Sequence, residues 1–332
     1  MREESRSRHR AGRAELLTAL RAAGIDAVLL GDDDGWAVVA PSLGARILAA
    51  GVDDENALWT APRIARAAWA DGGNVGGQRT WIAPEGGPRG FFFRTDPGLW
   101  TVPEELDPGG YVEVPGTDGW RSWECRFTAR CLDGESFPVS LTRSVRIARG
   151  ERGPVRLARV QLRQTLTNRG GTALDRRIGL WSIAQCPCGE GGRIVLTLAP
   201  DHGPSCVRPS FAPLLEGVLE MRPEAAVLRT VPGVKYKVGC DAHSAAGGVA
   251  FVGPRGGEYL LVALLTDVDR EGTYLDRPVF GGEVPCGDAI QAYNDPGTGG
   301  MAFCELETHA PALRLAPGGS QQAEVSMVVA FG

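Results

Sequence analysis

The hydrophobic pattern of this 332-residue chain changes its period near residue 25. Residues 14–23 carry apolar side chains at helical spacing and are followed by Gly24. Beyond this point apolar and polar residues alternate, as in Val160-Gln-Leu-Arg-Gln-Thr-Leu166, which is typical of half-buried strands. Asn168-Arg-Gly-Gly171 reads as a hairpin turn after one such strand. We therefore predict an all-β protein, with an N-terminal helical segment (residues 1–25) and one large antiparallel β domain (residues 26–332).

Composition agrees with this fold class and excludes several functions. The chain has 46 glycines and 23 prolines, a high share that suits a turn-rich β protein. Its net charge is −5 and its arginines are interspersed with acidic residues, which argues against nucleic-acid binding. No apolar run reaches the length of about 18 residues that a membrane span needs. No apolar stretch follows Met1 as in a secretory signal, so we expect a cytoplasmic protein whose eight cysteines are thiols.

The sequence offers no pattern for a metal ion or another cofactor. Cys186-Pro-Cys188 is the one close cysteine pair, and its spacing differs from that of a zinc knuckle. The four histidines form no His-Glu-x-x-His or comparable cluster. We expect neither a metal nor a cofactor.

A glycine-rich segment, residues 72–87, is the first candidate for a binding site. Asn74 and Arg79 can hydrogen-bond hydroxyl groups, Trp81 can stack on the apolar face of a sugar, and Glu85 adds a carboxylate. The glycines around them permit a ligand to approach the backbone closely. An equally good interpretation is a bend between two strands, in which Arg79 and Glu85 are simply paired.

The second candidate segment comprises residues 290–295 and 301–309, and it includes Asn294. In a strand, Glu305, Glu307 and His309 share one face, which suits a general base acting on a hydroxyl group. A solvated strand face explains the same pattern. Lys237 is a further candidate for binding, because Lys235 and Lys237 are the only lysines and would point to the same face of a strand.

Several of these motifs resemble a known family. Phe303-Cys-Glu-Leu-Glu-Thr-His-Ala-Pro311, the Leu315-Ala-Pro-Gly318 turn and the closing strand resemble the end of aldose 1-epimerase (galactose mutarotase) proteins. Residues 74–85, Leu180-Trp-Ser182 and Gln291-Ala-Tyr-Asn-Asp295 resemble uncharacterised bacterial families of the same superfamily more closely still. The resemblance covers about residues 35–332 and implies the mutarotase supersandwich, a large antiparallel β-sandwich that binds sugars on a concave face. It also implies that Glu307 is the catalytic glutamate.

The chain departs from this family at the residue that protonates the ring oxygen. The family has a histidine after a Thr-x-x-Asn strand, but here Thr165-Leu-Thr-Asn168 is followed by a strand with Trp181 or Ser182 near that place. His243 and His309 are the candidates to replace it.

Two functions follow from the resemblance. The first is a mutarotase-like isomerase, in which Glu307 is the base, Arg79 and Asn74 hold sugar hydroxyls and Trp181 forms the floor. A lyase or hydrolase that pairs Glu307 with Glu85 or Glu305 is a weaker variant. The second is a non-catalytic carbohydrate-binding protein on the same fold. In either case the expected partner is a small carbohydrate, and the expected assembly is a monomer or homodimer.

Overall fold

A computed structural model of the chain describes residues 12–61, 64, 74–87, 89–92, 100–148, 154–203, 205–210, 212–276, 287–297 and 302–332. The predicted N-terminal helix is present as α2 (Arg13–Ala22), one residue earlier than expected at each end. Its buried residues Leu16 and Leu20 pack with Trp36 and Val38 of the adjoining sheet. Residues 1–11 of the predicted helical segment lie outside the described residues. No helix in the described ranges has the length and apolar content required to cross a membrane.

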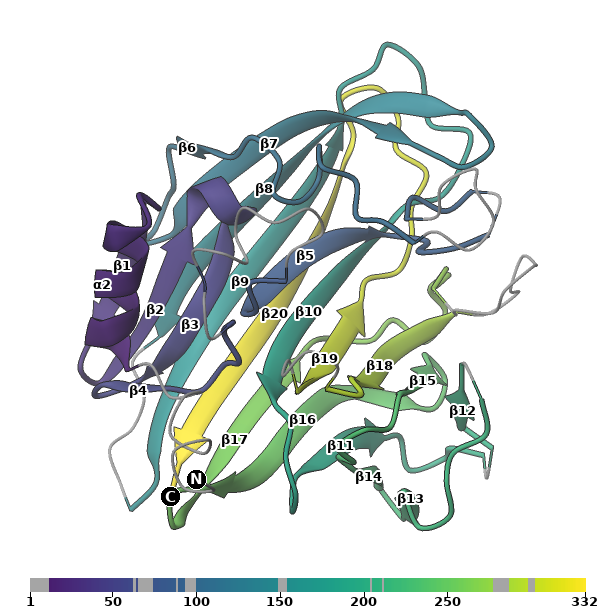
Figure 1. The fold of residues 1–332 in the computed structure, drawn as a ribbon. Helices are drawn as coiled ribbons and strands as arrows, with labels where there is room; N and C mark the ends of the chain where they lie inside the picture. Colours follow the sequence, from purple (N-terminus) through teal and green to yellow (C-terminus); the bar gives the residue numbers. More distant parts are fainter. Residues whose placement is uncertain are drawn as a thin grey trace.

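Two antiparallel sheets of ten strands each form the rest of the fold (Figure 1). The first sheet contains, in spatial order, β1 (Val28–Asp32), β2 (Gly35–Ala40), β3 (Arg46–Val52), β5 (Gln78–Ala83), β10 (Gly179–Pro187), β19 (Phe303–His309), β18 (Asp288–Asn294), β15 (Tyr236–Asp241) and β12 (Val207–Pro209), with β4 (Glu55–Asn56) paired to β3. The second contains β13 (Leu219–Arg222), β14 (Ala225–Arg229), β11 (Arg193–Leu198), β16 (Ala245–Arg255), β17 (Glu258–Leu265), β20 (Ser320–Phe331), β9 (Arg156–Asn168), β8 (Ser136–Ala148), β7 (Arg121–Arg130) and β6 (Val112–Val114). A single 3-10 turn, η1 (Pro41–Leu43), joins β2 to β3 in the described chain.

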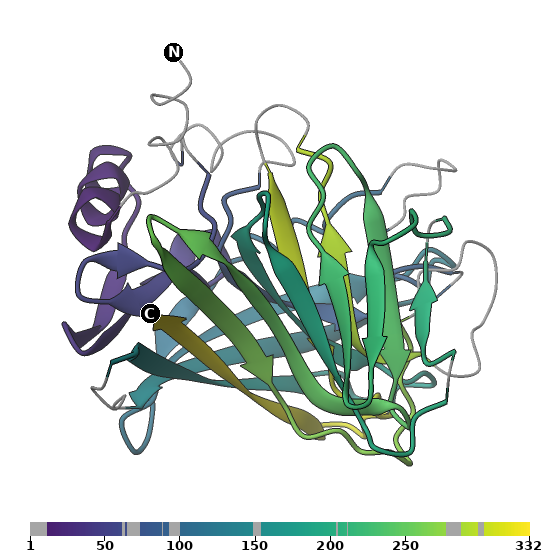
Figure 2. The ribbon, with the colours of Figure 1, turned by 90° about the horizontal axis from the view of Figure 1, so that it is seen from below.

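The two sheets pack face to face, and the main apolar core contains residues from both of them (Figures 1 and 2). Strand β9 shows the predicted alternation, because Val160, Leu162 and Leu166 are buried while Gln161 and Arg163 are partly exposed. The core therefore arises from the period-two pattern that indicated an all-β fold.

The hairpin predicted at residues 168–171 is wrong. Strand β9 pairs with β8 and β20 in the second sheet, whereas the next strand, β10, belongs to the first sheet. Asn168 explains the crossover, because its buried side-chain amide donates to the carbonyls of Thr172 and Leu315. The turn is thus bonded to a distant loop, and the chain passes from one sheet to the other.

Candidate active site

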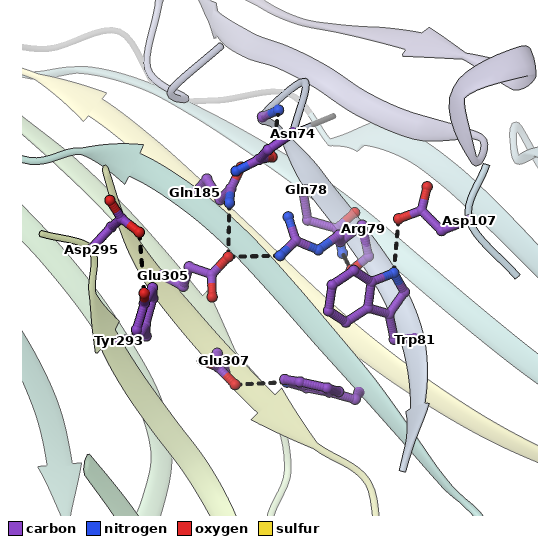
Figure 3. A network of polar contacts seen from close by, with 12 residues as sticks. Asn74, Gln78, Arg79, Trp81, Asp107, Gln185, Tyr293, Asp295, Glu305 and Glu307 are labelled. Carbon is purple, nitrogen blue, oxygen red and sulfur yellow. Dashed lines mark hydrogen bonds and ion pairs between the residues drawn. The ribbon is translucent and has the colours of Figure 1, made fainter. Parts of the chain in front are cut away.

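Side chains of five neighbouring strands meet on the outer face of the first sheet, the face turned away from the second sheet. Arg143 of β8 donates a hydrogen bond to the side chain of Gln78, so Gln78 points toward the second sheet. Successive strand residues point to opposite faces, and Arg79 therefore points outward. Register pairing places Ile183 between Arg79 and Glu307. The outward-facing set comprises Arg79, Trp81, Trp181, Gln185, Lys237, Gln291, Tyr293, Glu305, Glu307 and His309. Figure 3 labels Arg79, Trp81, Gln185, Tyr293, Glu305 and Glu307 of this set.

The three polar residues of β19 share one face, as the alternation predicted. Glu305, Glu307 and His309 are nevertheless only 9%, 0% and 2% exposed. The alternative of a solvated strand face is therefore wrong. Buried carboxyl and imidazole groups need polar partners, and their partners define the site.

Glu307 lies at the centre of the outward-facing set. Its Oε2 accepts hydrogen bonds from the indole of Trp181 at 2.8 Å and from Lys237 Nζ at 3.0 Å. Its Oε1 is buried without a hydrogen-bond partner. Burial raises the pKa of Glu307 to about 7, although Lys237 acts in the opposite direction. A carboxyl group with this pKa and one free oxygen can accept a proton near neutral pH.

Lys237 connects Glu307 with Glu85. Its Nζ lies 3.6 Å from Glu85 Oε2 and 4.8 Å from the centre of the Trp181 ring. Burial lowers the pKa of Lys237, but the nearby Glu307 and Glu85 outweigh burial and hold this pKa above its ordinary value. The lysine therefore stays charged, and it neutralises a carboxylate in a region that excludes water. Lys235 lies just before β15 and is exposed, with Nζ 6.0 Å from the Tyr293 ring.

Arg79 forms a second buried ion pair on the same face. Its guanidinium donates to Glu305 Oε1 at 2.7 Å, and Gln185 Nε2 donates to the same oxygen at 2.8 Å (Figure 3). The interpretation in which Arg79 pairs with Glu85 is wrong, because Glu85 contacts Lys237 instead. Glu305 Oε1, like Glu307 Oε2, is thus bound by two donors, and the two carboxyl groups differ in which residues hold them.

A third ion pair, between Arg46 and Asp107, contacts Trp81. The Arg79 guanidinium lies 4.2 Å from the centre of the Trp81 ring, and the Trp81 indole donates to Asp107 Oδ2 at 2.8 Å. The same oxygen contacts Arg46 at 2.5 Å. Burial tends to raise the pKa of Asp107, but Arg46 and Arg79 outweigh it, and the net pKa is lowered. This carboxylate is ionised and fully engaged.

His309 is a neutral acceptor in this arrangement. Gln291 Nε2 donates to the Asp276 carbonyl and to Asp288, so Gln291 Oε1 is the acceptor that faces His309 Nε2 at 3.2 Å. The network therefore assigns the proton to Nε2 and leaves Nδ1, which has no partner, as a bare acceptor. Burial, together with the charge of Lys237, lowers the pKa of His309 well below its ordinary value.

Asp276 belongs to the site but was not among the sequence candidates. It is 1% exposed, its Oδ1 accepts a hydrogen bond from the Glu85 backbone at 3.0 Å, and its Oδ2 lies 3.9 Å from His309 Nε2. No strand pattern marks this residue, because it lies in the connection before β18. Gln185 and Gln291 were also missed, although each alternates with apolar neighbours on its strand.

The two tryptophans expected to stack on a sugar are largely buried. Trp81 and Trp181 are 4% and 2% exposed and pack edge to face at 5.3 Å. Trp181 also stacks on His309 at 5.4 Å. Trp100, by contrast, is 40% exposed; its indole donates to Glu85 Oε1 at 2.9 Å and its ring stacks on Phe92.

Exposure rises along one chain of contacts from Glu307 through Lys237 and Glu85 to Trp100. The side chains of Glu307, Lys237 and Glu85 are 0%, 5% and 14% exposed. Trp100 is the most exposed member of this chain of contacts and therefore lies on the solvent side of the site.

Asn74 and Asn294 use their side-chain amides to bond the backbone instead of the outward-facing set. Asn74 is half-buried, and its Oδ1 accepts the Gly76 backbone N–H near the start of the glycine-rich segment; Figure 3 shows its side chain at the edge of the network. Asn294 points to the opposite face of β18, where its amide donates to the carbonyls of Val231 and Val234. The choice of Asn294 as a substrate-binding residue is corrected accordingly, because its polar atoms are used by the backbone.

The position expected for the family's acid histidine is occupied by other residues. Trp181 points into the site, and Ser182 points to the other face, where Gln78 donates to its hydroxyl. His243 is exposed in the turn between β15 and β16, and its carbonyl accepts a hydrogen bond from Arg270. Of the two histidines considered as replacements, only His309 lies at the site.

Other features of the described chain, a cavity and the cysteines, do not involve the residues of this face. A cavity of about 890 Å³ lies between residues 101–110 and the end of β7, and none of the candidate site residues lines it. The described residues contain no group of three or more side chains arranged to hold a metal ion. Seven cysteines are free of disulfides, and Cys286 lies outside the described residues.

Comparison with known proteins assigns the family and the fold. Residues 17–329 match the model of a family of unknown function, DUF6786, and the chain belongs to this family. No curated protein sequence matches the chain. The fold is that of galactose mutarotase-like proteins, as the resemblance implied.

Three solved structures illustrate this similarity. A candidate aldose 1-epimerase from Escherichia coli K12 has 13% sequence identity and a TM-score of 0.58, and the match covers 92% of this chain and 99% of the other. A galactose mutarotase-like protein from Lactobacillus casei has 11% identity and a TM-score of 0.53, with 92% and 100% covered. A galactose mutarotase related enzyme from Lactobacillus acidophilus has 10% identity and a TM-score of 0.52, with 92% and 97% covered. At sequence identities this low, the similarity shows a shared fold and does not show a shared activity.

Proposed function

We propose that this protein interconverts the anomers of a sugar on the outer face of the first sheet, with Glu307 as general base. The observation that carries the proposal is the state of the Glu307 carboxyl group. Trp181 and Lys237 hold one oxygen, the other is free, and the pKa is about 7. Such a group can take the proton of an anomeric hydroxyl at neutral pH and return it.

The charges of this face favour a neutral sugar. Among the described residues, the cations Arg46, Arg79 and Lys237 each contact a carboxylate of the protein. A phosphate or carboxylate on the ligand would have to compete with these buried pairs, which is costly. The buried atoms without a hydrogen-bond partner include the acceptors Glu307 Oε1 and His309 Nδ1, which suit the hydroxyl donors of an uncharged sugar, and the donor Arg79 Nε, which suits a hydroxyl oxygen.

A non-catalytic carbohydrate-binding protein is the second candidate function. The observation in its favour is the absence of the acid histidine from its family position, where Trp181 lies instead. A binding protein needs acceptors and an aromatic surface but no group that donates a proton to the ring oxygen.

Anomer exchange measured by NMR in dilute buffer distinguishes these functions, with α-D-glucose and α-D-galactose as the first probes. Glu307→Gln keeps the shape of the side chain, and we expect it to lower turnover by roughly two to four orders of magnitude, the usual contribution of a positioned base. Glu305→Gln is the matched control, because Glu305 lies on the same face but is held by Arg79 and Gln185. It should have a smaller effect.

Two results would argue against catalysis by Glu307. An active wild type with an unchanged rate in Glu307→Gln would exclude this residue as the base. A wild type that binds sugar without accelerating exchange would favour the binding protein, in which Glu307→Gln weakens affinity by about 1.5–3 kcal/mol.

A further inference from the structure

Asp276 has a buried carboxyl group, and one of its two oxygens has no hydrogen-bond partner. Its backbone carbonyl accepts hydrogen bonds from the Asp288 backbone and from Gln291, so the residue extends the edge of β18. Its Oδ1 is engaged by the Glu85 backbone, and its Oδ2 has no hydrogen-bond partner although the residue is only 1% exposed. Asp288, its neighbour, is different, because Arg208 and Gln291 contact its carboxylate. Within the described ranges, no lysine or arginine forms an ion pair with the Asp276 carboxyl group, and the nearby His309 ring is neutral.

The charges around Asp276 favour its protonated form. The titratable groups that act on it are Glu85, which follows β5, Lys237 of β15, and Glu307 and His309 of β19. Burial raises the pKa of Asp276 to about 8, with Glu85 adding to the rise and Lys237 opposing it. At neutral pH this carboxyl group therefore retains its proton, and Glu307 beside it is close to half ionised.

Asp276 and Glu307 are both neighbours of His309 on this face. Asp276 Oδ2 is 3.9 Å from His309 Nε2, and His309 follows Glu307 by two positions on the same face of β19. Two strand residues span about 6.6 Å, so Glu307 and His309 are separated along the backbone by about the width of a pyranose ring. The anomeric hydroxyl and the ring oxygen of a sugar are bonded to the same carbon, so a base and an acid on one protein face can serve both atoms.

We propose that Asp276 is the general acid of this site and takes the role of the missing histidine. This inference rests on the proposed function. Glu307 Oε1 removes the proton of the anomeric hydroxyl, the bond between the anomeric carbon and the ring oxygen breaks, and Asp276 Oδ2 gives its proton to that oxygen. Rotation of the resulting aldehyde and reversal of both transfers yield the other anomer and restore both residues. No oxidant, metal or second substrate enters the balance.

His309 is unsuited to this role in the same geometry. Its single proton is on Nε2 and is donated to Gln291, and its Nδ1 is a bare acceptor. We assign it a positioning role against Trp181 and as an acceptor for a hydroxyl group.

The test compares anomer exchange of α-D-glucose and α-D-galactose by wild type, Asp276→Asn and His309→Gln between pH 5 and 10. We expect the wild-type rate to fall on the alkaline side as Asp276 loses its proton. Asp276→Asn should lower the rate by about 10²–10⁴-fold and abolish the alkaline fall. His309→Gln should lower the rate less and keep the alkaline fall. If Asp276→Asn fails to fold, the pH profile of His309→Gln still tests whether His309 is the acid.

The outcomes separate this inference from the proposed function. If wild type and Glu307→Gln behave as proposed but Asp276→Asn keeps both the rate and the alkaline fall, Asp276 is not the acid. If the alkaline fall disappears in His309→Gln instead, His309 is the acid. If wild type accelerates neither sugar, the proposed function fails and the role of Asp276 fails with it.

Discussion

Replacement of Lys237 by methionine should destabilise the protein in a manner that depends steeply on pH. Removing one member of a buried ion pair costs about 3–5 kcal/mol if the remaining charge cannot be neutralised. Glu307 can be neutralised, because its pKa is already about 7 with the lysine present. Without Lys237 its pKa rises further, so the folded variant keeps the carboxyl protonated above pH 7, whereas the unfolded chain ionises it.

The magnitude follows from this difference in bound protons. A raised carboxyl pKa gives stability that is complete below the unfolded value and is lost as pH rises toward the folded value. Between pH 4.5 and 7 the folded wild type and the folded variant both hold the proton, and the difference in their free energy of unfolding stays small. Above pH 7 only the folded variant keeps this proton, so its free energy of unfolding falls relative to wild type by about 1.4 kcal/mol per pH unit. The difference is about 2 kcal/mol at pH 8.5. Asp276, with a pKa of about 8, adds to this loss only at the upper end of the range.

Urea denaturation at pH 5.5, 7.0 and 8.5 measures the effect. Lys235→Met is the matched control, because Lys235 lies two positions earlier, is exposed, and should change stability by less than about 0.5 kcal/mol at any pH. A loss for Lys237→Met that is equal at pH 5.5 and 8.5, or larger at pH 5.5, would refute the assignment of the proton to Glu307.

Two further substitutions test positions away from the acid and base. Asn294→Ala should lower the free energy of unfolding by about 1–3 kcal/mol in denaturant titrations, because it removes the side-chain donor to the half-buried Val234 carbonyl and one of two donors to the Val231 carbonyl, and it should leave anomer exchange unchanged. A lost exchange rate in a folded Asn294→Ala protein would return this residue to the site. Trp100→Ala should raise the exchange rate at low sugar concentration, since it removes the group on the solvent side of Glu85, while stability falls by about 1 kcal/mol with the lost Phe92 stacking. Slower exchange in Trp100→Ala would mean that Trp100 holds the sugar instead of covering the site.

The local hydrophobic pattern of the sequence was sufficient to predict the N-terminal helix, the β character of the rest of the chain and one face of the site. The helix and the face shared by Glu305, Glu307 and His309 follow from periods of 3.6 and two, which depend only on neighbouring residues. The same rule excludes Asn294 from that face, because Ile290 and Ala292 occupy alternate positions with it on the buried side of β18.

The ion pairs could not be obtained in this way. Arg79 and Glu305 are 226 residues apart, and their contact depends on β10 lying between β5 and β19. The order of strands in a sheet is set by long-range pairing, which no local period encodes. For the same reason the sequence offered the nearby Glu85 as the partner of Arg79. In the structure Glu85 instead contacts Lys237, which belongs to a strand far along the chain.

The balance of charges at this site decides which group can act as the acid. The carboxyl groups of Glu85, Asp107, Asp276, Glu305 and Glu307 outnumber the cations Arg46, Arg79 and Lys237, and burial raises the pKa of two of these carboxyl groups, Asp276 and Glu307. A histidine acid in such surroundings would need its charged form, but His309 is neutral because its pKa lies well below 6.5. An enzyme that depended on protonated His309 would lose activity well before pH 7. An enzyme that uses Asp276 keeps its acid to about pH 8, and the pH at which the alkaline fall begins therefore identifies the residue that protonates the ring oxygen.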